Sequence, residues 1–142
     1  MIDEKKIIDM FEKGFDCAQV ISYSIAKGLG IDTEIALKSS AAFGAGMFEA
    51  DLCGAYVGGL IALGLKYGHC KSGDELAKGQ MISKVFQYKE EFAKIKKYNK
   101  CSDILAYNLS IPSEAKIIEE KNLLMTVCPN LVKNVIEIVE AL

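Results

Sequence analysis

The cysteines are the residues of this chain that could carry chemistry, and four of the five occupy similar positions. Cys17, Cys53, Cys101 and Cys128 each lie at or next to a predicted helix start. The unpaired backbone N–H groups and the dipole of a helix N-terminus lower the pKa of a thiol and stabilise its thiolate. Because a thiolate is both the nucleophile in disulfide exchange and a metal ligand, this arrangement predicts redox chemistry or metal binding.

A simpler interpretation is that these cysteines only pack the core. Free cysteine is among the most buried residue types and often behaves as a small apolar side chain. For any single cysteine this interpretation is the stronger one. For four together it is the weaker one, since dispersed core thiols have no reason to gather at helix starts. No spacing is C-x-x-C, so neither a thioredoxin-like motif nor a zinc ribbon is indicated.

The segment around Cys53 is the most informative part of the sequence. The largely uncharged stretch 51–68 predicts a buried central helix, with Asp51 as its N-cap and Cys53 in its first turn. This position predicts a Cys53 pKa below the usual value of about 8.5. Each interior glycine costs a helix about 1 kcal/mol relative to alanine. We therefore expect Gly54 and Gly58 to be sites where other backbones approach closely.

Capping signals predict that two further cysteines lie at helix starts. Asp16 and Gln19 form a capping-box-like pair, which puts Cys17 at the first position of a helix. Pro129 fits the first position of a last helix, with Cys128 as the cap. The segment Phe43–Phe48, which contains two glycines, is expected to be a tight turn.

The periodicity of the whole chain predicts an all-α fold. Apolar residues recur at spacings of three and four, most clearly within 72–99, and no segment alternates in the manner of a strand. We expect one helical domain over residues 1–142, a bundle of about six to seven helices around the glycine-rich central helix.

Composition limits the classes of function. The 142 residues carry a formal net charge of −2, and every basic residue is lysine, so no nucleic-acid partner is expected. No stretch is long and apolar enough to span a membrane, and the N-terminal residues do not resemble a signal peptide. We therefore expect a cytoplasmic protein, in which structural disulfides are not anticipated. The sequence is compatible with an unidentified redox partner and with a homo-oligomer.

The same residues resemble a known family. The C_GCAxxG_C_C family of redox-active proteins has a CGAxxG signature, which Cys53-Gly54-Ala55-Tyr56-Val57-Gly58 matches. Agreement extends to Asp16-Cys17-Ala18-Gln19, Phe43-Gly44-Ala45-Gly46-Met47, Gly59-Leu60-Ile61-Ala62-Leu63-Gly64, Cys101 and Cys128-Pro129-Asn130-Leu131-Val132. The resemblance implies a small bacterial or archaeal protein with four family cysteines and a redox role, without a known reaction. Part of the split-Soret cytochromes is also similar, but the chain has no C-x-x-C-H for covalent haem.

Three hypotheses follow. In the first, a thiol oxidoreductase uses Cys53 as the low-pKa attacking sulfur, Cys17 as its nearest partner, and Cys101 with Cys128 as a second pair. In the second, the same four thiolates bind zinc or an iron–sulfur cluster. In the third, an interaction module uses its cysteines only for packing. The first two require the four sulfurs to share one pocket. Cys70, which lies outside the family pattern, should then lie apart, and a solvent-exposed loop is expected at His69.

Overall fold

The computed structural model describes residues 2–142, and it confirms the all-α class. Eight α-helices are present in these residues, rather than the expected six to seven. They are α1 (Glu4–Glu12), α2 (Cys17–Leu29), α3 (Thr33–Ser39), α4 (Gly54–Tyr67), α5 (Glu75–Ile95), α6 (Cys101–Leu105), α7 (Pro112–Glu120) and α8 (Leu123–Ala141). Two short turns, η1 (Ala41–Phe43) and η2 (Gly46–Ala50), connect α3 to α4.

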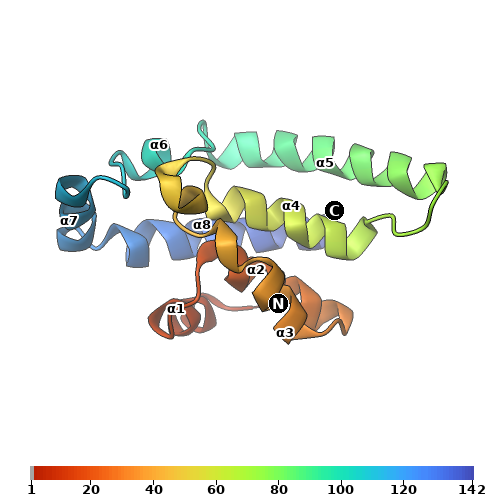
Figure 1. The fold of residues 1–142 in the computed structure, drawn as a ribbon, viewed down its shortest axis with the longest axis horizontal. Helices are drawn as coiled ribbons and strands as arrows, with labels where there is room; N and C mark the ends of the chain where they lie inside the picture. The colour runs from red at the N-terminus through yellow and green to blue at the C-terminus, as the bar shows by residue number, and fades with distance from the viewer. Residues whose placement is uncertain (1) are drawn as a thin grey trace.

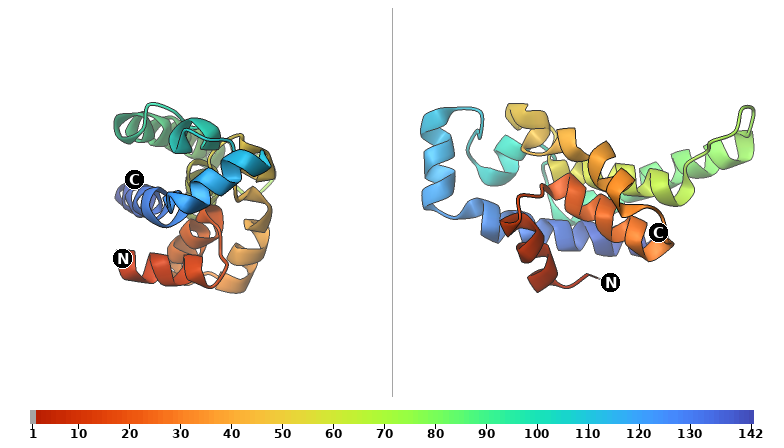
Figure 2. Two further views of the ribbon diagram at one scale, coloured as in Figure 1. Left: turned by 90° about the vertical axis from the view of Figure 1, so that its left-hand side faces the viewer. Right: turned by 60° about the horizontal axis from the view of Figure 1, so that its bottom comes forward.

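The longer helices lie side by side, and the shorter ones gather at one end. α4 packs against α2, α5 and α8, while α1 packs on α8 and α3 packs on α2. Figure 1 shows α5, α4 and α8 running along the molecule, with α6, α7 and the first turns of α4 and α8 at the same end. The two views in Figure 2 show α7 at that end, leading the chain from α6 into α8. None of the helices in residues 2–142 is long and apolar enough to cross a membrane.

The predicted cap of α2 is present. The backbone N–H of Asp16 donates to Oε1 of Gln19 at 3.1 Å, and the helix begins at Cys17 as expected. Gly30 ends α2 in the left-handed conformation, with φ of 71°. Such local hydrogen bonds satisfy backbone groups that a helix end leaves unpaired. They also fix Cys17 at the start of α2.

Glycine residues on α4 allow the neighbouring segments to approach this helix closely. A Cβ atom on Gly58 would lie 2.8 Å from Cα of Ala18, in α2. A Cβ on Gly54 would lie 2.7 Å from the carbonyl oxygen of Phe43 and 3.4 Å from Cβ of Cys17. Both distances to backbone atoms are too short for a real Cβ. The prediction that other backbones approach Gly54 and Gly58 is therefore confirmed.

On its other side, α4 is held by the buried aromatic residues of α5. The hydroxyl of Tyr88 donates to the carbonyl oxygen of Tyr56 at 2.9 Å, and its ring occupies the space that a Cβ on Gly59 would take. The rings of Tyr56 and Phe92 meet edge to face, with centroids 4.9 Å apart. A satisfied hydroxyl and close aromatic contacts make this a well-packed interface.

This packing predicts opposite effects of alanine at two glycines of the same helix. Gly58→Ala should lower the free energy of unfolding by about 1–3 kcal/mol, because the new methyl group meets the backbone of α2. The matched control is Gly64→Ala, where nothing lies within 4 Å of an added Cβ. That variant should gain about 0.5–1 kcal/mol from helix propensity. Urea denaturation of both variants measures the difference, and equal stability would contradict the close α2–α4 contact.

Candidate functional site

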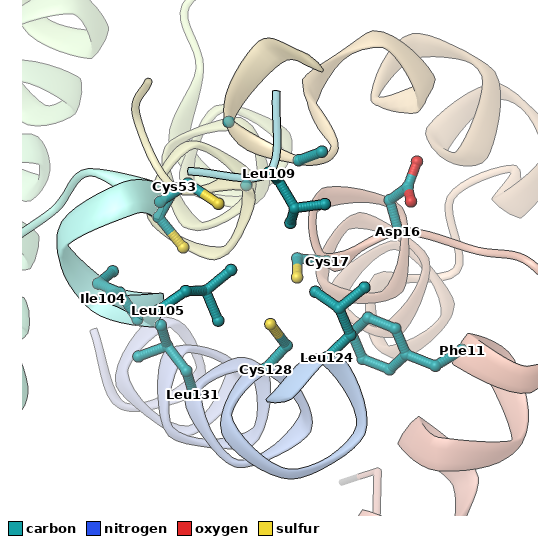
Figure 3. A pocket seen from close by; sticks show the side chains of 14 residues that line it. Phe11, Asp16, Cys17, Cys53, Ile104, Leu105, Leu109, Leu124, Cys128 and Leu131 are labelled. Atoms are coloured by element: carbon teal, nitrogen blue, oxygen red, sulfur yellow. The ribbon is translucent and has the colours of Figure 1, made fainter. Parts of the chain in front are cut away.

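The four cysteines singled out in the sequence line one cavity of about 110 Å³. Figure 3 shows the cavity between the starts of several helices, with sulfur atoms and leucine side chains around it. Its apolar wall consists of Phe11, Ile104, Leu105, Leu109, Leu124 and Leu131. Cys70 does not line the cavity and is exposed, and His69 is an exposed loop residue, as expected. The structure thus brings the four family cysteines together and leaves the fifth apart.

Two of these thiols, Cys17 and Cys128, face each other in the cavity wall. Cys17 is the first residue of α2, and Cys128 lies within α8. Figure 3 shows their sulfur atoms pointing toward one another. A hydrogen bond from the Cys17 thiol lowers the pKa of Cys128, and the same bond, together with burial, raises the pKa of Cys17 well above its usual value. Of the two thiols, Cys128 is therefore the one that ionises more readily.

Cys53 and Cys101, the second pair, are brought together by the backbone. The chain forms an isolated antiparallel bridge between Leu52 and Lys100. The N–H of Cys53 donates to the carbonyl of Asn99, and the N–H of Cys101 donates to the carbonyl of Asp51, each at 2.7 Å. These two bonds place residues distant in sequence at neighbouring positions in the cavity wall.

Burial keeps this second pair protonated. Burial raises the pKa of Cys101 to about 12, and the nearby charges of Cys53 and Cys128 add to the effect. The pKa of Cys53 is also raised, mainly by burial, although the backbone N–H groups of Tyr56 and Ala55 oppose the shift. Two thiols of raised pKa are poor nucleophiles at neutral pH.

The structure therefore differs from the sequence prediction at Cys53. The helix N–H groups do act to lower its pKa, as expected, but burial outweighs them. Cys53 is also the N-cap of α4 itself, since the helix begins at Gly54 and Asp51 belongs to the backbone bridge. The pairing differs as well, because Cys17 lies against Cys128 rather than acting as the nearest partner of Cys53.

The prediction that Cys128 caps the start of the last helix is also wrong. α8 begins at Leu123, and both Cys128 and Pro129 lie inside it, so only three of the four cysteines are at helix starts. Asn122 precedes the helix in a left-handed conformation, with φ of 54°. Pro129 has no N–H to donate to the carbonyl of Met125, which a helix tolerates at the expense of one hydrogen bond. The low pKa of Cys128 thus comes from Cys17 and not from a helix end.

Sequence reasoning treated Asp16 only as a cap, yet Asp16 also lines the cavity. Burial raises the pKa of its carboxyl group. The side chain lies against Gly44, where an added Cβ would overlap the carboxyl group. The sequence feature that could have indicated this role of Asp16 is its position immediately before Cys17. It is the only carboxyl group among the described residues that line the cavity.

The η2 turn contributes another part of the wall that the sequence did not reveal. Ala45, Met47, Phe48 and Ala50 all have positive φ, between 48° and 60°. Non-glycine residues in this conformation each cost about 1–2 kcal/mol. The turn is held by hydrogen bonds such as that from the N–H of Asp51 to the carbonyl of Gly46 at 2.9 Å. A tight turn was expected here, but nothing in these residue types indicates a left-handed one.

A metal site requires at least three ligands at coordinating distance. Among residues 2–142, no group of three or more His, Cys, Asp or Glu side chains is arranged to hold a metal ion. The four sulfurs share a cavity but are grouped as two pairs. As arranged, they do not fit a zinc ion or an iron–sulfur cluster.

Comparison with known proteins gives one match. A family model described as "Putative redox-active protein (C_GCAxxG_C_C)" matches residues 15–142. The matched range includes every residue of the two cysteine pairs and leaves out α1. Neither the curated proteins nor the solved structures gave a match.

The lowered pKa of Cys128, beside Cys17, predicts an order of reactivity. In the folded protein, iodoacetamide should alkylate Cys128 at lower pH than Cys17, Cys53 or Cys101, as mapped by peptide mass spectrometry. Cys17→Ala should raise the alkylation midpoint of Cys128, because the thiolate loses its donor. Cys17→Ser is the matched control, since its hydroxyl can still donate. Alkylation of Cys53 first would show that the helix N-terminus, not the thiol pair, controls reactivity.

Proposed function

We propose that this chain, which belongs to the C_GCAxxG_C_C family of redox-active proteins, is a thiol oxidoreductase whose working couple is Cys17 and Cys128. The observation that carries the proposal is that these two side chains face each other in the wall of a shared cavity. Oxidation joins the two sulfurs in a disulfide and releases two electrons and two protons to an acceptor. Reduction of that disulfide by a redox partner restores the two thiols.

The two members of the couple have different roles. Cys128 is the attacking sulfur, because the neighbouring Cys17 thiol lowers its pKa. Cys17 keeps its proton and then closes the disulfide, since its sulfur already faces Cys128. Cys53 and Cys101 form a second dithiol in the same wall, and their raised pKa values make its exchange with the Cys17–Cys128 disulfide slow at neutral pH. The use of free thiols fits a reducing compartment such as the cytoplasm.

Within this proposal, α4 is the helix around which the site is built. Its N-terminus carries Cys53, and the absence of a side chain at Gly54 lets the start of α2 lie beside it. A larger residue at this position would push Cys17 away from the cavity. The glycine-rich face of α4 therefore supports both the packing of the bundle and the position of the first thiol.

A metal or iron–sulfur carrier on the same four thiolates is the second candidate. It is favoured by the convergence of four sulfurs on one cavity, and it requires their side chains to rearrange from two pairs into one set of ligands. Metal analysis combined with a thiol count, on protein purified without air, separates the two candidates. The redox proposal predicts free thiols at all four positions and no stoichiometric metal.

The couple should be detectable by stepwise oxidation of the reduced protein with diamide, a small uncharged thiol oxidant. As the amount of diamide increases, the protein should lose two hydrogen atoms in mass, and peptide mapping should assign the first disulfide to Cys17 and Cys128. The double variant Cys53→Ser/Cys101→Ser should still form it, whereas Cys128→Ser should not. A first disulfide between Cys53 and Cys101, or none involving Cys128, would contradict the proposed couple.

A further inference from the structure

The walls of the cavity restrict what can oxidise the thiol pair. A volume of about 110 Å³ accommodates several water-sized groups but not a peptide. Large apolar side chains form most of the wall, and none of the lining residues is basic. The one carboxyl group there, that of Asp16, would oppose a second anion. A charged disulfide such as oxidised glutathione, which carries several carboxylates, therefore has neither the space nor a counter-ion.

The reactive sulfurs face this cavity rather than the surface. Cys17 and Cys128 are both only partly exposed, and Cys53 and Cys101 are buried. A protein disulfide would have to reach Cys128 past Leu109 and Leu124, which also line the cavity. A small uncharged molecule meets neither obstacle, because apolar walls penalise a neutral solute far less than a charged one.

Building on the proposed function, we propose that the oxidant taken up at this site is a small uncharged hydroperoxide, either hydrogen peroxide or a short alkyl hydroperoxide. The Cys128 thiolate attacks the terminal oxygen of the hydroperoxide. A sulfur–oxygen bond forms, the oxygen–oxygen bond breaks, and Cys128 becomes a sulfenic acid. The released alkoxide or hydroxide takes a proton from water, which balances the proton that the Cys128 thiol lost on ionising.

The second step uses the geometry of the pair. The sulfur of Cys17 attacks the sulfenic sulfur of Cys128, a disulfide forms, and the hydroxyl group leaves as water with the proton of Cys17. In total, two thiols and one hydroperoxide give one disulfide, one alcohol or water, and one further water. Because the two sulfurs already point toward one another, this step needs no large movement.

Cys70 provides an internal reference for the test, because it is exposed and lies outside the cavity. The reduced wild-type protein is treated in separate reactions with tert-butyl hydroperoxide and with oxidised glutathione, and each cysteine is followed by peptide mass spectrometry. The hydroperoxide should oxidise Cys128 at least about tenfold faster than Cys70. Oxidised glutathione should show the reverse preference and modify Cys70 first. In Cys17→Ser, dimedone should trap the sulfenic acid at Cys128.

Diamide, a small uncharged thiol oxidant, distinguishes a failure of the hydroperoxide proposal from a failure of the proposed Cys17–Cys128 couple. If diamide forms the Cys17–Cys128 disulfide but the hydroperoxide reacts no faster at Cys128 than at Cys70, this inference is overturned and the proposed couple stands. Equal or faster modification of Cys128 by oxidised glutathione also overturns it. If neither diamide nor the hydroperoxide forms that disulfide in the folded protein, the proposed couple itself fails.

Discussion

The proximity of Cys17 and Cys128 in the cavity wall is the interaction on which the properties of the site depend. Inside an apolar cavity, a lone thiolate is disfavoured because burial removes the water that would solvate its charge. The neighbouring Cys17 thiol lowers the pKa of Cys128, whereas the pKa of Cys17 itself is raised. Cys128 is therefore the more readily ionised member of the pair. The second pair has no comparable donor and stays protonated.

The position of Cys17 depends on a close contact between α2 and α4. Cys17 can reach the cavity because α2 lies directly against α4, where Gly54 and Gly58 have no side chains. The bridge between Leu52 and Lys100 fixes the opposite wall, since it sets the starts of α4 and α6 next to each other. Small residues in a helix and two backbone hydrogen bonds therefore position the sulfurs. The thiols themselves contribute little to holding the bundle together.

Local features of the site were predictable from the sequence, and non-local ones were not. The cap at Asp16, the first helical position of Cys17 and the close approach at Gly58 each follow from neighbouring residues or from residue size. The start of α8 was misplaced because Pro129 is equally compatible with a first position and with a tolerated break inside a helix. The raised pKa of Cys53 and the pairing of the thiols depend on burial and on contacts between distant segments. No local pattern encodes them.

The position of the couple within the chain has a topological consequence. Cys17 lies in the second helix and Cys128 in the last, so a disulfide between them would close nearly the whole chain into a covalent ring. Cross-linking so long a loop removes entropy from the unfolded ensemble, which in the chain-entropy model stabilises the folded state by about 4–5 kcal/mol. The oxidised and reduced forms would thus differ in how often they open to proteases as well as in their chemistry. Through this difference, the cavity's redox state would regulate the lifetime of the protein in the cell.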